Sequence, residues 1–369
     1  MDDNRTTLAA EIAAELELTL PSAARSLADK LRQSEHLRRS LQELGLVRRL
    51  TPPDHDTTEL DVTGISAAAT TLPAFGGLLY GTTVHAHRLR LAQRAILDAS
   101  EEVRVHVGDL DFYESGQRLR WKLGQHMFEL VADLLAESAP SRLILLDLPI
   151  FISRGEEGNR ELIEEVQEEW LEMVDTVNSF WRNHRERIYP LRSDGVILAS
   201  LQAQNALPLF IALNNNPSTS PDLVPPELPT FVRTEWTHLR QAGMARLVDA
   251  LLPACSRTIA YAFEDLHLDP RWQPSELHHS GILGFFMRAN DKSPVWQVQV
   301  AGHRTQWTTE MLDQIAITLS QVTLTSGKQA EPLPLWYARR MATFPRPMLA
   351  VFRDLADEVI RAGSADTLA

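Results

Sequence analysis

The strongest constraint on the fold is a short aliphatic run, LILL at residues 143–146, that ends in Asp147. A strand without polar side chains is usually buried on both faces of a sheet. The residues before it, 116–138, place apolar side chains at helical spacing: Leu119, Leu123, Met127, Leu130, Val131 and Leu134. A helix that leads into a buried strand is typical of α/β proteins. We therefore expect a mixed sheet core with helices packed against it.

The other segments fit the same expectation. Residues 60–97 are rich in glycine, β-branched and aliphatic side chains, with turn signals between them, and predict two or three strands paired as hairpins. The segments GVILASLQ, GILGFFMRA and VWQVQVAG predict later strands, the last two bent into a pair at NDKSP. LPLFIALN predicts a strand or a short helix, and longer helices are predicted at 232–252, 308–324 and 345–362.

Two helical regions stand apart from this core in the sequence. A helix at 6–18 and a longer one from Ser22 to Gly45 precede the segment TPPDHDTTEL, so we expect a helical arm at 1–57 and a main domain at 58–369. Residues 160–187 carry an apolar seam with spacings of three and four, acidic residues at the start and basic residues at the end. We interpret residues 156–190 as a helical insertion that forms a hairpin arm or a dimer contact.

Composition excludes several classes of protein. The chain of 369 residues has a net charge of −13, which is unusual for a protein that coats nucleic acid, although a confined basic site or a metal ion could still handle DNA. No apolar run reaches the roughly 18 residues of a membrane span, and the acidic first twenty residues do not form a secretory signal. The single cysteine, Cys255, excludes an internal disulfide. We expect a cytoplasmic protein.

Three acidic residues are candidates for a divalent-metal site. Asp147 ends the buried run, where a carboxylate costs free energy unless it is paired or coordinates a cation. Asp61 begins the segment DVTG, and Glu129 lies on the helix before the buried strand. If they converge, their hard oxygen ligands suit Mg²⁺ or Mn²⁺. The alternative remains that Asp147 caps a turn and Asp61 is solvated. His85 and His87 are two apart on a predicted strand, and without a third ligand nearby we expect them to be satisfied or exposed.

The order of these segments resembles the NurA nuclease family. LDVTGIS stands where the family has a strand with an Asp-Gly-Ser-like turn. HMFELVADLLAES followed by LILLDLPI is similar to the family's acidic helix and its Leu-Leu-Asp-Gly strand. GILGFFMRA, VWQVQVAG and the segment EPLPLWYARRMATFPRPMLAVFRDLADEVI resemble its last strands and terminal helix. The resemblance spans residues 58–360 approximately.

The resemblance implies an RNase H-like, metal-dependent DNA nuclease that pairs with a HerA-like ATPase, a hexameric DNA translocase, and forms a homodimer. It implies Asp61, Glu129 and Asp147 as the catalytic residues that hold Mn²⁺ or Mg²⁺, with Arg339 and Arg340 on the DNA backbone. The chain also departs from the family pattern. Glu331 replaces a tyrosine, Arg339 replaces a histidine, and Val62 and Leu148 follow the aspartates in place of glycine. Arginine can hold phosphate but cannot exchange a proton, so binding could persist where turnover is impaired.

These observations leave three hypotheses. The first is an active DNA nuclease in DNA-end processing, either in repair or in antiviral defence. The second is a catalytically inactive subunit of the same fold that docks on the ATPase or holds DNA. The third is an interaction protein built around the helix at 160–187.

Overall fold

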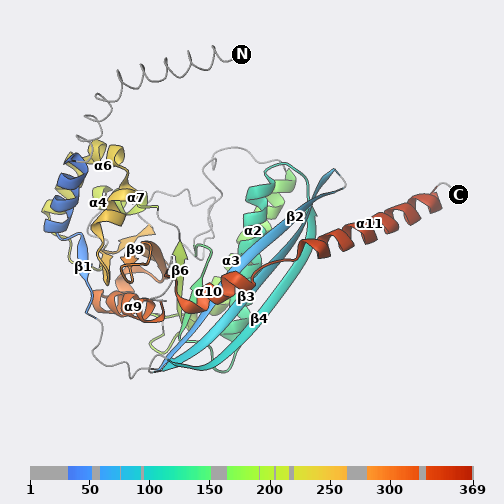
Figure 1. Ribbon diagram of the computed structural model, residues 1–369, viewed down its shortest axis with the longest axis horizontal. Coiled ribbons are helices and arrows are strands. Elements are labelled where there is room, and N and C mark those ends of the chain that lie inside the picture. Colours follow the sequence, from blue (N-terminus) through green and yellow to red (C-terminus); the bar gives the residue numbers. More distant parts are fainter. Residues whose placement is uncertain are drawn as a thin grey trace, which may run out of the picture.

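The described strands of the computed structural model form one ten-stranded mixed sheet (Figure 1). The structure describes residues 32–51, 59–74, 76–92, 95–150, 164–190, 192–202, 205–215, 220–263, 281–323 and 330–367. An antiparallel meander opens the sheet, built from β2 (Leu60–Ala74), β3 (Gly77–Ala92) and β4 (Ala95–Leu110). β5 (Leu143–Leu146) lies parallel to β2, and β6 (Ile197–Gln202) lies parallel to β5. The resulting order β4-β3-β2-β5-β6 is that of an RNase H-like sheet, which confirms the predicted fold class.

The sheet continues beyond β6 as an antiparallel extension. Its strands are β10 (Trp296–Ala301), β9 (Ile282–Arg288), β7 (Ser256–Thr258) and β1 (Val47–Arg49), with β8 (Tyr261–Ala262) also paired to β9. The predicted pair GILGFFMRA and VWQVQVAG is thus confirmed as β9 and β10.

Helices cover the two faces of the sheet and bury two hydrophobic clusters. On one face lie α2 (Ser115–Ala136) and α3 (Glu164–His184), over a cluster that includes Ile65, Ile144 and Leu146. On the other lie α9 (Thr309–Val322) and α10 (Leu333–Met341), over a cluster that includes Val62, Leu143 and Leu145. Because the side chains of a strand alternate, β5 is buried on both sides, as its aliphatic sequence predicts.

The predicted arm at 1–57 is described only in part. Residues 32–43 are helical and bury Leu37 and Leu41 completely in the main core, and Gly45, with φ +80°, follows the end of this helix. β1 then joins the sheet. The described part of the arm therefore packs on the main domain. The helix at 6–18 and most of the joint at 51–60 lie outside the described residues, so the boundary at residue 57 stays a prediction.

The seam of the helix at 160–187 packs within the chain. Val166, Trp170, Met173, Val177 and Phe180 are all buried in the main cluster. Trp170 meets Trp121 of α2 at a ring-centroid distance of 5.1 Å, and Phe180 meets Phe128 at 4.9 Å. The interpretation as a dimer contact was wrong for these residues, because α2 already covers them. The beginning of the predicted insertion, 156–163, lies outside the described residues.

The remaining helix predictions differ in detail. The helix predicted at 232–252 is three short helices, α5 (Glu227–Thr234), α6 (Trp236–Ala242) and α7 (Met244–Leu251). Gly243, with φ +83°, separates the last two because this backbone conformation cannot continue a helix. LPLFIALN forms a helix, α4 (Leu207–Asn215). α9 and α11 (Arg346–Thr367) confirm the other two predictions, and no helix among the described residues could span a membrane.

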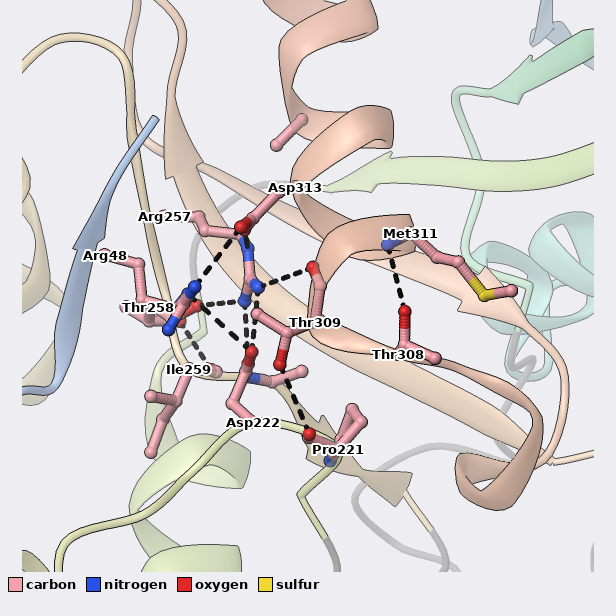
Figure 2. Close-up of polar contacts among 12 residues, drawn as sticks. Arg48, Pro221, Asp222, Arg257, Thr258, Ile259, Thr308, Thr309, Met311 and Asp313 are labelled. Carbon is pink, nitrogen blue, oxygen red and sulfur yellow. Dashed lines mark hydrogen bonds and ion pairs between the residues drawn. The ribbon is translucent and has the colours of Figure 1, made fainter. Parts of the chain in front are cut away.

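A buried ionic network ties the antiparallel extension to α9 (Figure 2). Arg257 of β7 donates two hydrogen bonds to Asp222 at 2.7 and 2.8 Å and one to Asp313 of α9 at 2.6 Å. Asp222 also accepts the Ala260 amide at 2.7 Å, and Arg48 of β1 lies 3.3 Å from Asp313. Arg257 and Asp222 are fully buried, whereas Arg48 and Asp313 are partly exposed, so the network joins β1, β7, α9 and the segment around residue 222 from the interior to the surface.

Candidate functional site

The candidate site lies where β5 ends beside β2. The Asp147 amide donates to the Ile65 carbonyl at 2.9 Å and so extends the parallel pairing of β2 and β5 by one residue. This register places Asp147 next to Ser66, whose hydroxyl donates to the Asp147 carboxylate at 2.6 Å. On the other side of β2, Ser66 is opposite His85 of β3. The residue of β2 that contacts the Asp147 carboxylate is thus a serine and not an acid.

An arginine from α10 sits directly on Asp147. Arg339 donates from Nη2 to Asp147 Oδ1 at 2.6 Å and from Nε to Oδ2 at 3.2 Å. Its third nitrogen, Nη1, donates to Glu331 Oε2 at 2.6 Å. Burial alone would lower the pKa of Arg339, but Asp147 and Glu331 outweigh it and hold that pKa above its ordinary value. A permanent cation therefore lies between two carboxylates, and we call Ser66, Asp147, Glu331 and Arg339 the strand-end cluster.

Gly64 explains how α10 comes close enough to deliver Arg339. A Cβ atom at Gly64 would lie 2.4 Å from the Leu335 backbone nitrogen and 2.4 Å from the Pro334 carbonyl carbon. Only the absence of a side chain lets β2 and the first turn of α10 touch through their backbones. The glycine that the sequence retains in LDVTGIS thus positions α10 over the strand end.

Asp61 lies away from this cluster. It precedes the β2–β5 pairing, whereas Asp147 follows it, so five residues, or roughly 16 Å of strand, separate their levels. Asp61 also faces the other side of the sheet, where Arg88 holds it with hydrogen bonds of 2.6 and 2.9 Å and Ser141 donates to it at 3.0 Å. It lines a cavity of about 1060 Å³ together with Arg88 and α9 side chains. The expectation that Asp61 and Asp147 share one cation is therefore corrected.

Glu129 occupies a third location. It lies on α2, and its Oε2 is 3.4 Å from Arg104 Nη1 of β4 and 3.9 Å from His106 Nε2. α2 and α10 cover opposite faces of the sheet, so Glu129 cannot reach the strand-end cluster. The three acids predicted as one ligand set each pair with a different arginine, and together they do not fit a shared Mn²⁺ or Mg²⁺.

Imidazole and aromatic side chains of β3 and α10 lie beside the strand-end cluster. His87 of β3 stacks on Tyr337 of α10 at a centroid distance of 4.7 Å, and His85 Nε2 lies 3.3 Å from Glu101 of β4. Burial lowers the pKa of His85 and of His87, so both are neutral at pH 7. The expectation that they are satisfied or exposed was wrong, because each has a buried Nδ1 with no hydrogen-bond partner among the described residues.

Arg340 is more accessible than Arg339. It is exposed at the end of α10, and its guanidinium carbon lies 4.3 Å from the centre of the Trp336 ring. This cation–π contact orients the guanidinium while leaving its N–H groups open to solvent. Of the two arginines predicted to contact DNA, Arg340 is thus the one whose donors face water.

No family model and no curated protein matches this chain, whereas solved structures do. The NurA nuclease from Sulfolobus solfataricus matches with a TM-score of 0.54 and 13% identity, over 96% of this chain and 98% of that one. This chain has a NurA-like fold. Weaker likenesses are a NurA bound to dAMP and manganese (TM-score 0.44, 10% identity, 90% and 95% covered) and the catalytic domain of human Endonuclease V (TM-score 0.35, 13%, 85% and 94%).

Sequence reasoning missed Ser66 as the partner of Asp147. The sequence predicted the NurA-like fold. It predicted Asp61 of LDVTGIS as the neighbour of Asp147, whereas the strand register places Ser66 there. Glu331 and Arg339, the two departures from the family pattern in this segment, pair with each other in the strand-end cluster.

Proposed function

We propose that this chain is a NurA-like subunit that holds DNA without cutting it, with Arg339 in the position of a catalytic cation. The observation that carries the proposal is the strand-end cluster. A metal site of a nuclease needs converging carboxylates and open coordination positions for phosphate and water. Here Arg339 uses both oxygens of Asp147 and one of Glu331, and Ser66 supplies no second carboxylate from β2.

The surface beside the cluster supports DNA binding. Arg340 over Trp336, with Tyr337 next to them on α10, combines a basic group with aromatic rings on one helix. Single-stranded DNA binds to surfaces of this kind, because bases stack on the rings and the cation meets the phosphates. The net charge of −13 makes non-specific binding elsewhere unfavourable and so favours a confined DNA site.

The partner and the oligomeric state are part of the same proposal. Following the resemblance, the subunit would dock on a HerA-like ATPase and form a homodimer. α11 supports the dimer, since it extends away from the sheet (Figure 1). It exposes an apolar stripe at helical spacing: Met348, Val351, Phe352, Leu355 and Val359. An uncovered apolar face of this length is typical of a helix that packs on a second chain.

Two assays on the purified full chain test the proposal. With end-labelled linear DNA, we expect no cleavage in Mn²⁺ or Mg²⁺ and measurable binding by fluorescence anisotropy. Arg340→Gln should weaken single-strand binding about three- to tenfold, whereas Arg39→Gln, an exposed arginine on the helix at 32–43, should not. Cleavage that disappears in Asp147→Asn would contradict the non-cutting role. Unchanged binding by Arg340→Gln would contradict the DNA site.

A second candidate is a divalent-metal-dependent DNA nuclease that uses Mn²⁺ or Mg²⁺. One observation favours it, because Asp147 and Glu331 lie within reach of the same guanidinium, and moving Arg339 away would leave two carboxylates facing one point. The cleavage assay separates the candidates, since this nuclease loses activity in Glu331→Gln as well as in Asp147→Asn.

A further inference from the structure

A second group of metal-ligating side chains lies on the opposite face of the sheet. His106 comes from β4, and His126 and Glu129 come from α2. One potential ligand atom from each lies within 4.8 Å of the other two. We propose that these three residues bind a divalent transition metal of the Zn²⁺ class that fastens α2 to the edge of the sheet.

The secondary structure places the ligands. His126 and Glu129 are three residues apart on α2, so they share one face of the helix. His106 is directly opposite Thr82 in the β3–β4 pairing, and the Thr82 hydroxyl lies 3.0 Å from His126 Nδ1. The contact between Thr82 and His126 therefore sets the helix over the strand at the level of His106.

Thr82 also orients the imidazole. With His126 Nδ1 engaged by the buried hydroxyl, Nε2 is the nitrogen left for a metal. A ligating histidine usually has its other ring nitrogen hydrogen-bonded, which fixes the tautomer and the ring orientation. Thr82 is completely buried and His126 is 7% exposed, so this orientation is held by packing.

The donor set selects the class of metal. Two imidazole nitrogens and one carboxylate oxygen suit Zn²⁺, Co²⁺ or Ni²⁺, whereas Mg²⁺ and Ca²⁺ prefer oxygen ligands. Ligands on a tetrahedral zinc ion lie about 2.0–2.2 Å from it, hence roughly 3.3 Å from one another. The rings of His106 and His126 stack at 3.6 Å with an interplanar angle of 9°, so one ring must turn out of the stack before both nitrogens can face one ion. His106, whose side chain is 37% exposed, is the ring that can turn, since Thr82 holds His126. Water would complete the coordination.

Arg104 competes with the metal for Glu129. Its Nη1 lies 3.4 Å from Glu129 Oε2, while Nη2 pairs with Asp133. The arginine can keep Asp133 when Glu129 turns to the metal, so the pair weakens binding without blocking it. Removing the competitor should therefore tighten the site.

Isothermal titration of Zn²⁺ into the metal-stripped full chain tests the inference. We expect one site per chain, at least tenfold weaker in His106→Gln and in Glu129→Gln, and tighter in Arg104→Gln. His238→Gln, an exposed histidine beside Glu235, is the matched control and should bind as the wild type does. Zn²⁺ should raise the melting temperature of the wild type but not of His106→Gln, and millimolar Mg²⁺ should not compete.

Several results would overturn the inference: no Zn²⁺ binding by the wild type, binding unaffected by both ligand variants, or binding lost in His238→Gln. Circular dichroism of each variant shows that it is folded before it is titrated. Asp147→Asn should leave Zn²⁺ binding unchanged, because it alters only the opposite face. The metal site and the proposed DNA function can therefore fail separately.

Discussion

Two arginines in this molecule each bridge a pair of acids, and they do so in different surroundings. Arg257 joins Asp222 and Asp313 inside the antiparallel extension (Figure 2). Arg339 joins Asp147 and Glu331 at the end of β5. The Arg257 and Asp222 side chains are 0% exposed, whereas Arg339 is 35% and Asp147 20% exposed. Similar chemistry thus occurs once in the interior and once at a surface that a ligand can reach.

The difference lies in how completely each network is satisfied. Arg257 also donates to the carbonyls of Thr258 and Thr309, and Asp222 accepts the Ala260 amide, so the buried charges have partners on several sides. Arg339 has only carboxylate partners in the described structure, and water reaches it. The buried network is fixed by the fold, whereas the strand-end cluster can exchange a carboxylate for a phosphate oxygen.

The largest expected effect is on the buried network. Arg257→Met should lower the free energy of unfolding by about 3–5 kcal/mol, because Asp222 would stay buried without its counter-charge. Urea unfolding followed by circular dichroism measures the change. If the free energy of unfolding falls by less than about 1 kcal/mol, burial does not make the Arg257 network more important for stability than the strand-end cluster.

Gly64→Ala should give the next largest effect. The added Cβ would collide with the α10 backbone, and an overpacked contact of this kind costs about 1–3 kcal/mol. Moving α10 should also weaken DNA binding through Arg340. Gly116→Ala in α2 is the control, since a Cβ there meets nothing within 4 Å and should not destabilise. If both variants are equally stable, the backbone of α10 does not contact β2 at Gly64.

Arg339→Met should lower the free energy of unfolding by less than Arg257→Met does, by about 1 kcal/mol, since Arg339 and Asp147 are partly exposed and water can solvate the carboxylates that the arginine leaves. It leaves Asp147 and Glu331 facing each other with no cation. We therefore expect this variant, unlike the wild type, to gain a Mn²⁺-dependent rise in melting temperature that Glu331→Gln removes. A Mn²⁺ shift of equal size in the wild type would show that Arg339 does not compete with a metal.

The smallest expected effect is on the pH dependence of stability, which the buried network around Asp222 should change in acid. Burial raises the pKa of Asp222, but the hydrogen bonds and charge of Arg257 outweigh it and hold that pKa below the ordinary 3.8. The unfolded chain then binds the proton more readily, so the stabilisation is complete above about pH 3.8 and is lost as the pH falls through the lowered value. Arg257→Met should lose this pH dependence below pH 3.8, as unfolding at a series of pH values would show. If the free energy of unfolding of Arg257→Met depends on pH as it does in the wild type, the dependence arises from other acidic residues.

Much of the fold follows from local sequence pattern. The aliphatic run at 143–146, the periodic helix before it and the β-branched segments from residue 60 each specify their element, because burial requires those side chains in those orders. The break at Gly243 was less accessible, since a single glycine can also continue a helix at moderate cost.

The site was harder to predict because it depends on strand register. Whether Asp61 or Ser66 meets Asp147 is decided by how β2 and β5 align, and no local pattern in either strand fixes that alignment. The group of His106, His126 and Glu129 needs two elements that meet only after folding. Its one local sign, a histidine and a glutamate three residues apart on a predicted helix, is common without a metal.

Arg339 occupies the place of a cation between Asp147 and Glu331. Crystals of the wild-type protein soaked in Mn²⁺ and measured at the manganese absorption edge test it directly. We predict no anomalous peak between the two carboxylates, with the guanidinium still within hydrogen-bond distance of both. A peak there, with Arg339 turned away, would contradict it.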